Sequence, residues 1–181
     1  MPGRCGQAGH LCCQRLPAFL MMKPAPAAIL SNPVHCLAFG FGAGLAPKAP
    51  GTFGTLVAIP LHFLLVQVAF NLVIYIAMIV VAFLVGIYLC GKTARDLGVH
   101  DHGGIVWDEF VGYWITMILV PLTWYWVLAG FVAFRFFDIV KPWPIGWLDK
   151  KVHGGFGIML DDAIAGLYAA ACLQAAMLVL Q

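Results

Sequence analysis

Residues 49–91 read APGTFGTLVAIPLHFLLVQVAFNLVIYIAMIVVAFLVGIYLCG and contain no charged side chain. At roughly 1.5 Å per helical residue, this run is about twice as long as one crossing of a ~30 Å hydrocarbon core requires. We therefore predict two membrane helices, near 53–69 and 72–90, with a turn between Gln67 and Asn71. The whole chain is 62% hydrophobic and 10% charged, which excludes an ordinary soluble domain and indicates an integral membrane protein.

Two further uncharged runs lie toward the C-terminus. The first, 110–134, is interrupted at Pro121, which predicts either two shorter helices or one kinked span, because proline removes a backbone hydrogen bond. We favour the hairpin, since a single span would place Glu109 and Asp138 on opposite faces of the bilayer. The second run, 163–181, is rich in alanine and suits a last membrane helix packed through small residues. The predicted fold is an all-α, polytopic membrane bundle of about four to five membrane helices.

The basic residues predict an orientation. If both long runs are hairpins, one side of the membrane receives Lys48, Lys92, Arg95, Lys141, Lys150 and Lys151. Short loops rich in lysine and arginine stay in the cytoplasm, so we expect the charged loops on the cytoplasmic face. Residues 1–30 contain four prolines and three cysteines. We expect them to be a disordered extension or a mis-assigned start, which leaves 31–181 as the membrane-embedded domain.

The carboxylates are confined to one stretch of the chain. All eight lie between residues 96 and 162: Asp96, Asp101, Asp108, Glu109, Asp138, Asp149, Asp161 and Asp162. Asp108 and Glu109 open a membrane helix. The helix dipole is the ordinary explanation for acids there, but an unpaired carboxylate beside lipid is costly and usually functional. Asp161 and Asp162 follow a glycine-rich turn at 154–157, and a divalent cation is the natural way to keep two neighbouring carboxylates ionised. These acids indicate a metal site or a proton path.

Basic side chains accompany the acids. Arg135 and Asp138 lie three residues apart on one helical face, and Pro142 ends that helix near Val140. An internal salt bridge, with Lys141 reaching the lipid headgroups, would explain these residues without any function. The functional interpretation makes Asp138 a metal ligand and the two basic residues phosphate ligands, since a guanidinium group matches phosphate geometry.

A glycine- and hydroxyl-rich turn, PKAPGTFGT at 47–55, leads into the first membrane helix. Backbone amides at a helix start, with Lys48 and the hydroxyl groups of Thr52 or Thr55, are suited to binding a phosphate. A helix cap and an interfacial lysine explain the same residues equally well. Carboxylate oxygens beside a set of basic groups are how proteins hold Mg²⁺ with a phosphate. No histidine pattern indicates zinc.

Four segments, in the right order, resemble the phosphatidylglycerophosphatase A family: APGTFGT (49–55), DEFVG (108–112), RFFDIVKPWPI (135–145) and GGFGIMLDDAIAG (154–166). The resemblance spans roughly residues 37–180. It implies an all-helical, Mg²⁺-dependent lipid phosphatase of the bacterial inner membrane that converts phosphatidylglycerophosphate to phosphatidylglycerol and inorganic phosphate. We expect a phospholipid substrate in the membrane and no nucleic-acid partner. The sequence leaves the oligomeric state open.

The resulting hypothesis assigns roles to ten residues. The catalytic and metal-binding residues are Asp108, Glu109, Asp138, Asp161 and Asp162, and the phosphate-binding residues are Arg135, Lys141, Lys48, Thr52 and Thr55. We favour a water held by the metal as the nucleophile, and an aspartyl-phosphate intermediate is the alternative. A CDP-alcohol phosphatidyltransferase would have a further acid where Ala165 stands. A small ion or proton transporter would have its acids in mid-helix rather than near helix ends.

Overall fold

The two helices expected from the long uncharged run are present. In the computed structural model, which describes residues 26–99 and 102–180, α3 (Pro50–Val68) and α4 (Leu72–Asp96) form a hairpin. Asn71 caps α4, because its side chain accepts a hydrogen bond of 3.0 Å from the Ile74 amide. The other elements are α1 (Pro26–Ser31), α2 (Pro33–Ala38), the 3-10 helix η2 (Gly40–Leu45), α5 (Trp107–Thr116), α6 (Trp124–Val140), α7 (Ile145–Lys151) and α8 (Gly154–Leu180). Every regular element in the described residues is helical, as predicted.

Three helices in the described ranges are long and apolar enough to cross a membrane: α3, α4 and α8, with 19, 25 and 27 residues. By contrast, α5 has 10 residues, and at about 1.5 Å per residue it reaches about halfway through a ~30 Å core. The predicted count of four to five spans is therefore not confirmed. The chain leaves the helix at Thr116, Leu119 adopts a left-handed φ of 58°, and α6 begins only after Pro121.

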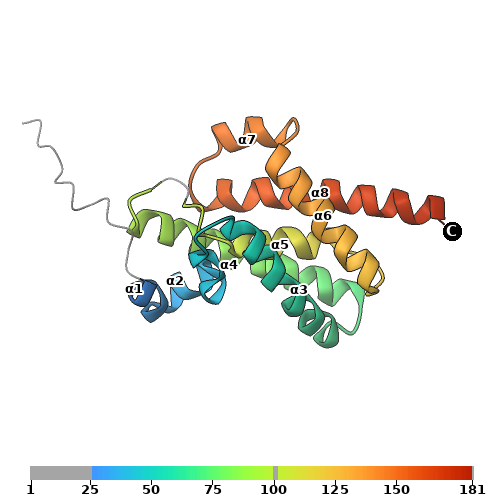
Figure 1. Cartoon of the computed structure of the whole chain (residues 1–181), viewed down its shortest axis with the longest axis horizontal. Helices are drawn as coiled ribbons and strands as arrows, with labels where there is room; N and C mark the ends of the chain where they lie inside the picture. The colour runs from blue at the N-terminus through green and yellow to red at the C-terminus, as the bar shows by residue number, and fades with distance from the viewer. Residues whose placement is uncertain (1–25, 100–101, 181) are drawn as a thin grey trace, which may run out of the picture.

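Helix α5 is the buried centre of the bundle. Each of its residues from Glu109 to Thr116 is buried, and α3, α4, α6 and α8 all contact it. Figure 1 shows the short α5 among the longer helices, with α7 lying over α8. The hairpin favoured from the sequence is confirmed, because α5 and α6 run in opposite directions and bring Glu109 to 3.2 Å from Arg135.

Small residues let α8 approach its neighbours closely. Ala165 and Ala169 are fully buried, as expected for a helix packed through alanine. The glycine turn predicted at 154–157 is wrong, however, because α8 already begins at Gly154. A Cβ atom on Gly155 would overlap the Ile87 carbonyl oxygen of α4. Gly155 therefore serves close helix packing, whereas Gly154 starts the helix with a left-handed φ of 78°.

The N-terminal helices are attached to the end of α4. His35 of α2 places its Nδ1 3.0 Å from the Thr93 hydroxyl and its Nε2 3.4 Å from an Asp96 oxygen. The extension predicted over residues 1–30 lies mostly outside the described residues. Ile29 of α1 is buried against the core, so the packed fold begins before residue 31.

Candidate active site

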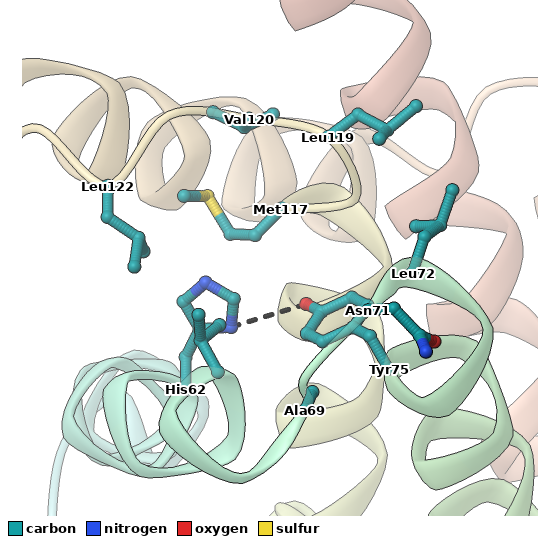
Figure 2. A pocket seen from close by; sticks show the side chains of 10 residues that line it. His62, Ala69, Asn71, Leu72, Tyr75, Met117, Leu119, Val120 and Leu122 are labelled. Atoms are coloured by element: carbon teal, nitrogen blue, oxygen red, sulfur yellow. Dashed lines mark hydrogen bonds between the residues drawn. The ribbon is translucent and has the colours of Figure 1, made fainter.

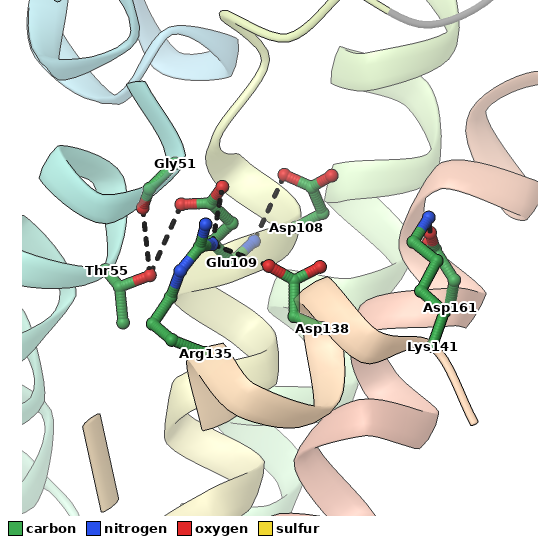
Figure 3. Close-up of polar contacts among 8 residues, drawn as sticks. All are labelled: Gly51, Thr55, Asp108, Glu109, Arg135, Asp138, Lys141 and Asp161. Atoms are coloured by element: carbon green, nitrogen blue, oxygen red, sulfur yellow. Dashed lines mark hydrogen bonds and ion pairs between the residues drawn. The ribbon is translucent and has the colours of Figure 1, made fainter. Parts of the chain in front are cut away.

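Four helix ends meet where the sequence places its charged residues. The starts of α3, α5 and α8 lie beside the end of α6, because α4 returns the chain to this side after α3 and α6 returns it after α5. Glu109 comes from the first turn of α5, and Arg135 and Asp138 come from the last turns of α6. Asp161 and Asp162 lie two turns into α8. Figure 3 shows side chains from all four helices gathered at this end of the bundle.

Arg135 lies between two carboxylates. Its Nη1 is 3.2 Å from Glu109 Oε1 and 2.6 Å from Asp138 Oδ2 (Figure 3). These three side chains are only 11–15% exposed, so the ion pairs are screened little by solvent. Burial raises the pKa of the Glu109 carboxyl above its usual value, Arg135 opposes this rise, and the charge of Asp138 adds to it.

Gly51 and Gly54 also belong to this site, although the sequence motif that contains them assigned them no role. A Cβ atom on Gly51 would overlap Glu109 Oε1 and lie 2.9 Å from Arg135 Nη1, and one on Gly54 would overlap Glu109 Oε2. Only glycine at both positions lets α3 pack this closely against the ion pair. The available signal was their spacing of three residues, which places both on one face of a helix.

Thr55 supports Glu109. Its hydroxyl donates to the Gly51 carbonyl at 2.9 Å and lies 3.4 Å from Glu109 Oε2 (Figure 3). The side chain is fully buried, so water does not compete for its contact with Glu109. The other two residues predicted from this turn lie farther out: Lys48 is exposed before α3, and Thr52 is half-buried in its first turn.

Lys141 follows α6 and joins two further acids. Its Nζ lies 2.6 Å from Asp161 Oδ2 and 3.3 Å from Asp149 Oδ2. Burial by itself lowers the pKa of Lys141, but the hydrogen bond and charge of Asp161, with Asp149, raise it above its usual value. Asp149 lies on α7, and that helix turns its carboxylate, 43% exposed, toward Lys141.

Asp162 is the most enclosed of the acids. It is 4% exposed, and the charges of four other carboxylates act on it: Asp108, Asp138, Asp161 and Glu109. Asp108 also accepts a hydrogen bond of 3.1 Å from the Glu109 amide, an arrangement typical of a first helical turn. The five predicted metal ligands thus lie at the same end of the bundle, and their role as ligands stays a prediction.

The donor set fits a hard cation. Asp161 Oδ1 and Asp162 Oδ2 are buried and have no hydrogen-bond partner in the described part of the chain, and buried carboxylate oxygens normally have one. Within residues 26–99 and 102–180, no three acid, histidine or cysteine side chains are placed to hold a metal ion, so this end is not a preformed metal cage. Mg²⁺ does not require such a cage, because one or two carboxylates, with waters and substrate phosphates, usually hold it.

A second polar group is buried near the other end of α5. His62 of α3 is 1% exposed, and its Nδ1 lies 3.2 Å from the Tyr75 hydroxyl, which donates to the Trp114 carbonyl at 2.7 Å. Figure 2 shows this pair beside a cavity of about 270 Å³ between the α3–α4 and α5–α6 turns. The residues that line the cavity carry no formal charge when His62 is neutral, unlike the acidic end of the bundle.

A family model and two individual proteins that resemble the chain carry the same name. A family model described as phosphatidylglycerophosphatase A matches residues 36–177. The chain is 53% identical over 145 residues to phosphatidylglycerophosphatase A of Escherichia coli strain K12, covering 80% of this chain and 83% of that protein. It is 50% identical over 148 residues to phosphatidylglycerophosphatase A of Haemophilus influenzae strain Rd, covering 81% and 90%.

A more distant relative carries a different name. The chain is 42% identical over 137 residues to a Bacteroides thetaiotaomicron protein, named provisionally as a phosphatidylinositol-3-phosphatase, covering 72% of this chain and 84% of that protein. No solved structure matches the chain.

Proposed function

The chain belongs to the phosphatidylglycerophosphatase A family and is a phosphatase, and on this basis we propose that it hydrolyses phosphatidylglycerophosphate to phosphatidylglycerol and inorganic phosphate with the help of Mg²⁺. The proposal concerns the terminal phosphomonoester of a lipid whose acyl chains stay in the bilayer. The charged end of the bundle is the place where such a headgroup would meet the protein.

The single observation behind the metal requirement is the charge balance of this end. Five carboxylates face two cations, Arg135 and Lys141, and both cations are already paired with acids. A phosphomonoester is also anionic, and two unit charges 4 Å apart repel by about 4 kcal/mol at an effective dielectric constant of 20. A site of this composition needs an additional cation before it can accept a phosphate.

The residues that would hold Mg²⁺ are the five acids, with Asp161 and Asp162 contributing the two buried oxygens that have no hydrogen-bond partner in the described structure. Bound there, the ion would neutralise charge on the transferring phosphoryl group. Asp108, Glu109 and Asp138 are the other carboxylates of this set, and their negative charges act on Asp162. This assignment explains why several acids are buried together although each of them raises the cost of ionising the others.

Arg135 and Lys141 are the proposed phosphate ligands. A guanidinium group can bind two phosphate oxygens at once, and Arg135 still has a buried Nε with no hydrogen-bond partner among the described residues. Each basic side chain would exchange a carboxylate partner for the substrate. Lys48 and Thr52, near the rim, would meet the headgroup as it enters, whereas Thr55 would orient Glu109.

Hydrolysis breaks the bond between the terminal phosphorus and the glycerol oxygen. That oxygen takes up a proton and becomes a hydroxyl of phosphatidylglycerol, and the phosphoryl group leaves as inorganic phosphate. Phosphoryl transfer depends mainly on in-line positioning and charge stabilisation. We propose water as the nucleophile, and attack by one of the aspartates remains the alternative.

The location of the basic residues supports a cytoplasmic active site in the bacterial inner membrane. Lys48 precedes α3, Arg95 lies in the last turn of α4, and Lys141 follows α6. The start of α3 and the ends of α4 and α6 lie on the same side of the bundle as the acids. By the bias of lysine and arginine toward cytoplasmic loops, this side faces the cytoplasm.

The test is phosphate release by the detergent-purified protein. We expect release from phosphatidylglycerophosphate in Mg²⁺ and almost none in EDTA, with activity restored when excess Mg²⁺ is added back. Phosphatidic acid and phosphatidylinositol 3-phosphate are the control substrates, the second because of the name of the Bacteroides relative. Undiminished release in EDTA would remove the metal from the proposal, and a preference for either control lipid would change the substrate.

A further inference from the structure

An apolar groove of about 540 Å³ lies between the α3–α4 hairpin and α5. Its longest wall is one face of α4, from Ile74 through Ala77 and Val81 to Val85, and Trp107 and Trp114 of α5 form the opposite wall. Ala77 is exposed, so its small side chain leaves space that a larger one would fill.

The groove offers no free polar group to a ligand. The polar side-chain atoms of its lining are the two indole nitrogens, and both already donate to backbone carbonyls: Trp107 to Ala82 at 3.1 Å and Trp114 to Ala58 at 3.2 Å. These bonds also fix the rings, so the groove is formed before anything binds. Its chemistry suits a hydrocarbon chain and excludes a headgroup.

The length of the groove matches one leaflet. From Ile74 to Val85, the α4 wall rises about 16 Å at 1.5 Å per residue, and one half of a ~30 Å hydrocarbon core is about 15 Å. A fully extended acyl chain in one leaflet therefore has about the length of this wall.

The groove reaches the helix turn that carries one acid of the candidate active site. Its upper wall is Trp107, and the next residue, Asp108, lies in the same first turn of α5 among the acids that surround Asp162. In phosphatidylglycerophosphate, one glycerol and one phosphodiester separate the terminal phosphate from the acyl-bearing glycerol, so a lipid with its phosphate at those acids would direct its acyl chains toward the Trp107 end of the groove.

Resting on the proposed function, we propose that this groove holds one acyl chain of the phosphatidylglycerophosphate substrate while its phosphate lies at the acidic site. Contacts to a chain remote from the reaction are the same before and during hydrolysis, so they lower KM without changing kcat. The groove is thus a determinant of acyl-chain preference.

The experiment compares dioleoyl with dihexanoyl phosphatidylglycerophosphate in the unsubstituted protein and in Ala77→Phe, with Val81→Trp as a second filling variant. The matched control is Val80→Phe, because Val80 is 50% exposed on the same helix but does not line the groove. Both filled positions are exposed, so each variant retains its fold, which its melting temperature in detergent verifies.

Filling the groove should lower kcat/KM for the dioleoyl lipid by about tenfold, the factor that corresponds to losing the burial of about two methylene groups. The change should lie in KM, and the dihexanoyl lipid should be unaffected. Equal loss on both lipids, or none on either, would overturn the groove assignment and leave the proposed function intact. If the unsubstituted protein releases phosphate from neither lipid, the proposed function fails first and the inference fails with it.

Discussion

Two polar groups are buried at opposite ends of α5, and they differ in charge balance. At the start of the helix, Glu109 belongs to a set of five carboxylates with two cations, and oxygens of Asp161 and Asp162 lack hydrogen-bond partners in the described chain. Toward its end, His62 and Tyr75 form a neutral pair whose hydroxyl is satisfied by the Trp114 carbonyl.

Under the proposed function, this difference in charge balance distinguishes a polar group that stabilises the fold from one that binds metal and substrate. A satisfied neutral network inside a membrane protein stabilises one packing arrangement. A group of like charges with unused oxygens destabilises the empty protein and gains stability only when a cation binds. Substitutions at the two ends should therefore change different observables: activity and metal response at the acidic end, and thermal stability alone at the neutral end.

The largest expected effect is that of Asp162→Asn. This change keeps the size of the side chain and removes the charge at the centre of the acidic set. We expect kcat to fall by a factor of about 10²–10³, the scale of losing one preorganised electrostatic contribution. In EDTA the melting temperature should not fall, because a repulsive charge has been removed. Phosphate release and a melting curve measure both, and turnover like that of the unsubstituted protein would remove Asp162 from the site.

Arg135→Ala should reduce both stability and activity. It leaves Glu109 and Asp138 without their shared cation, and breaking a buried ion pair in this way costs up to about 3–5 kcal/mol. Because those carboxylates then face each other, added Mg²⁺ should restore more thermal stability to this variant than to the unsubstituted protein. Melting temperatures with and without Mg²⁺ test this, and an equal Mg²⁺ shift in both proteins would contradict it.

Thr55→Val should have a smaller effect at the same end. It removes one hydroxyl contact with Glu109, worth about 0.5–1.5 kcal/mol, and should lower kcat several-fold through misplacement of that carboxylate. Thr116→Val is the matched control, since Thr116 is equally buried but donates to the Gly112 carbonyl at 3.0 Å. Steady-state measurement of kcat for both variants tests this prediction. Similar losses in the two would mean that the Thr55 hydroxyl supports the helix rather than Glu109.

The smallest effect on activity should come from the neutral end. Tyr75→Phe removes the 2.7 Å bond to the Trp114 carbonyl and should lower the free energy of unfolding by about 1 kcal/mol, while kcat and its dependence on Mg²⁺ stay unchanged. The measurement pairs a melting curve with the phosphate assay. A large loss of activity without loss of stability would show that the two ends of α5 are functionally coupled.

Much of the candidate site could be predicted from the sequence, because acids and bases next to long apolar runs are unusual whatever their partners. The motifs indicated the five acids and Arg135, and the structure pairs Arg135 with Glu109 and Asp138, whereas the metal-binding role stays a prediction. The roles of Gly51 and Gly54 could not be predicted, since a glycine in a helix start has several explanations and only the nearby Glu109 carboxylate selects one. The α7 helix was missed because a seven-residue segment with adjacent lysines reads equally well as a loop.

The sequence by itself determined that this is a helical membrane protein and identified its family, because uncharged run length and motif order are properties of the chain alone. Only the tertiary structure decided that α5 is a short, buried helix, that Arg135 pairs with Glu109 while Lys141 pairs with Asp161, and that Trp107 and Trp114 line an apolar groove with α4. The physical reason is that the two kinds of property depend on different parts of the chain. Transfer into a membrane depends on local hydrophobicity, whereas pairing and cavities depend on how side chains from different helices fit within a few ångströms.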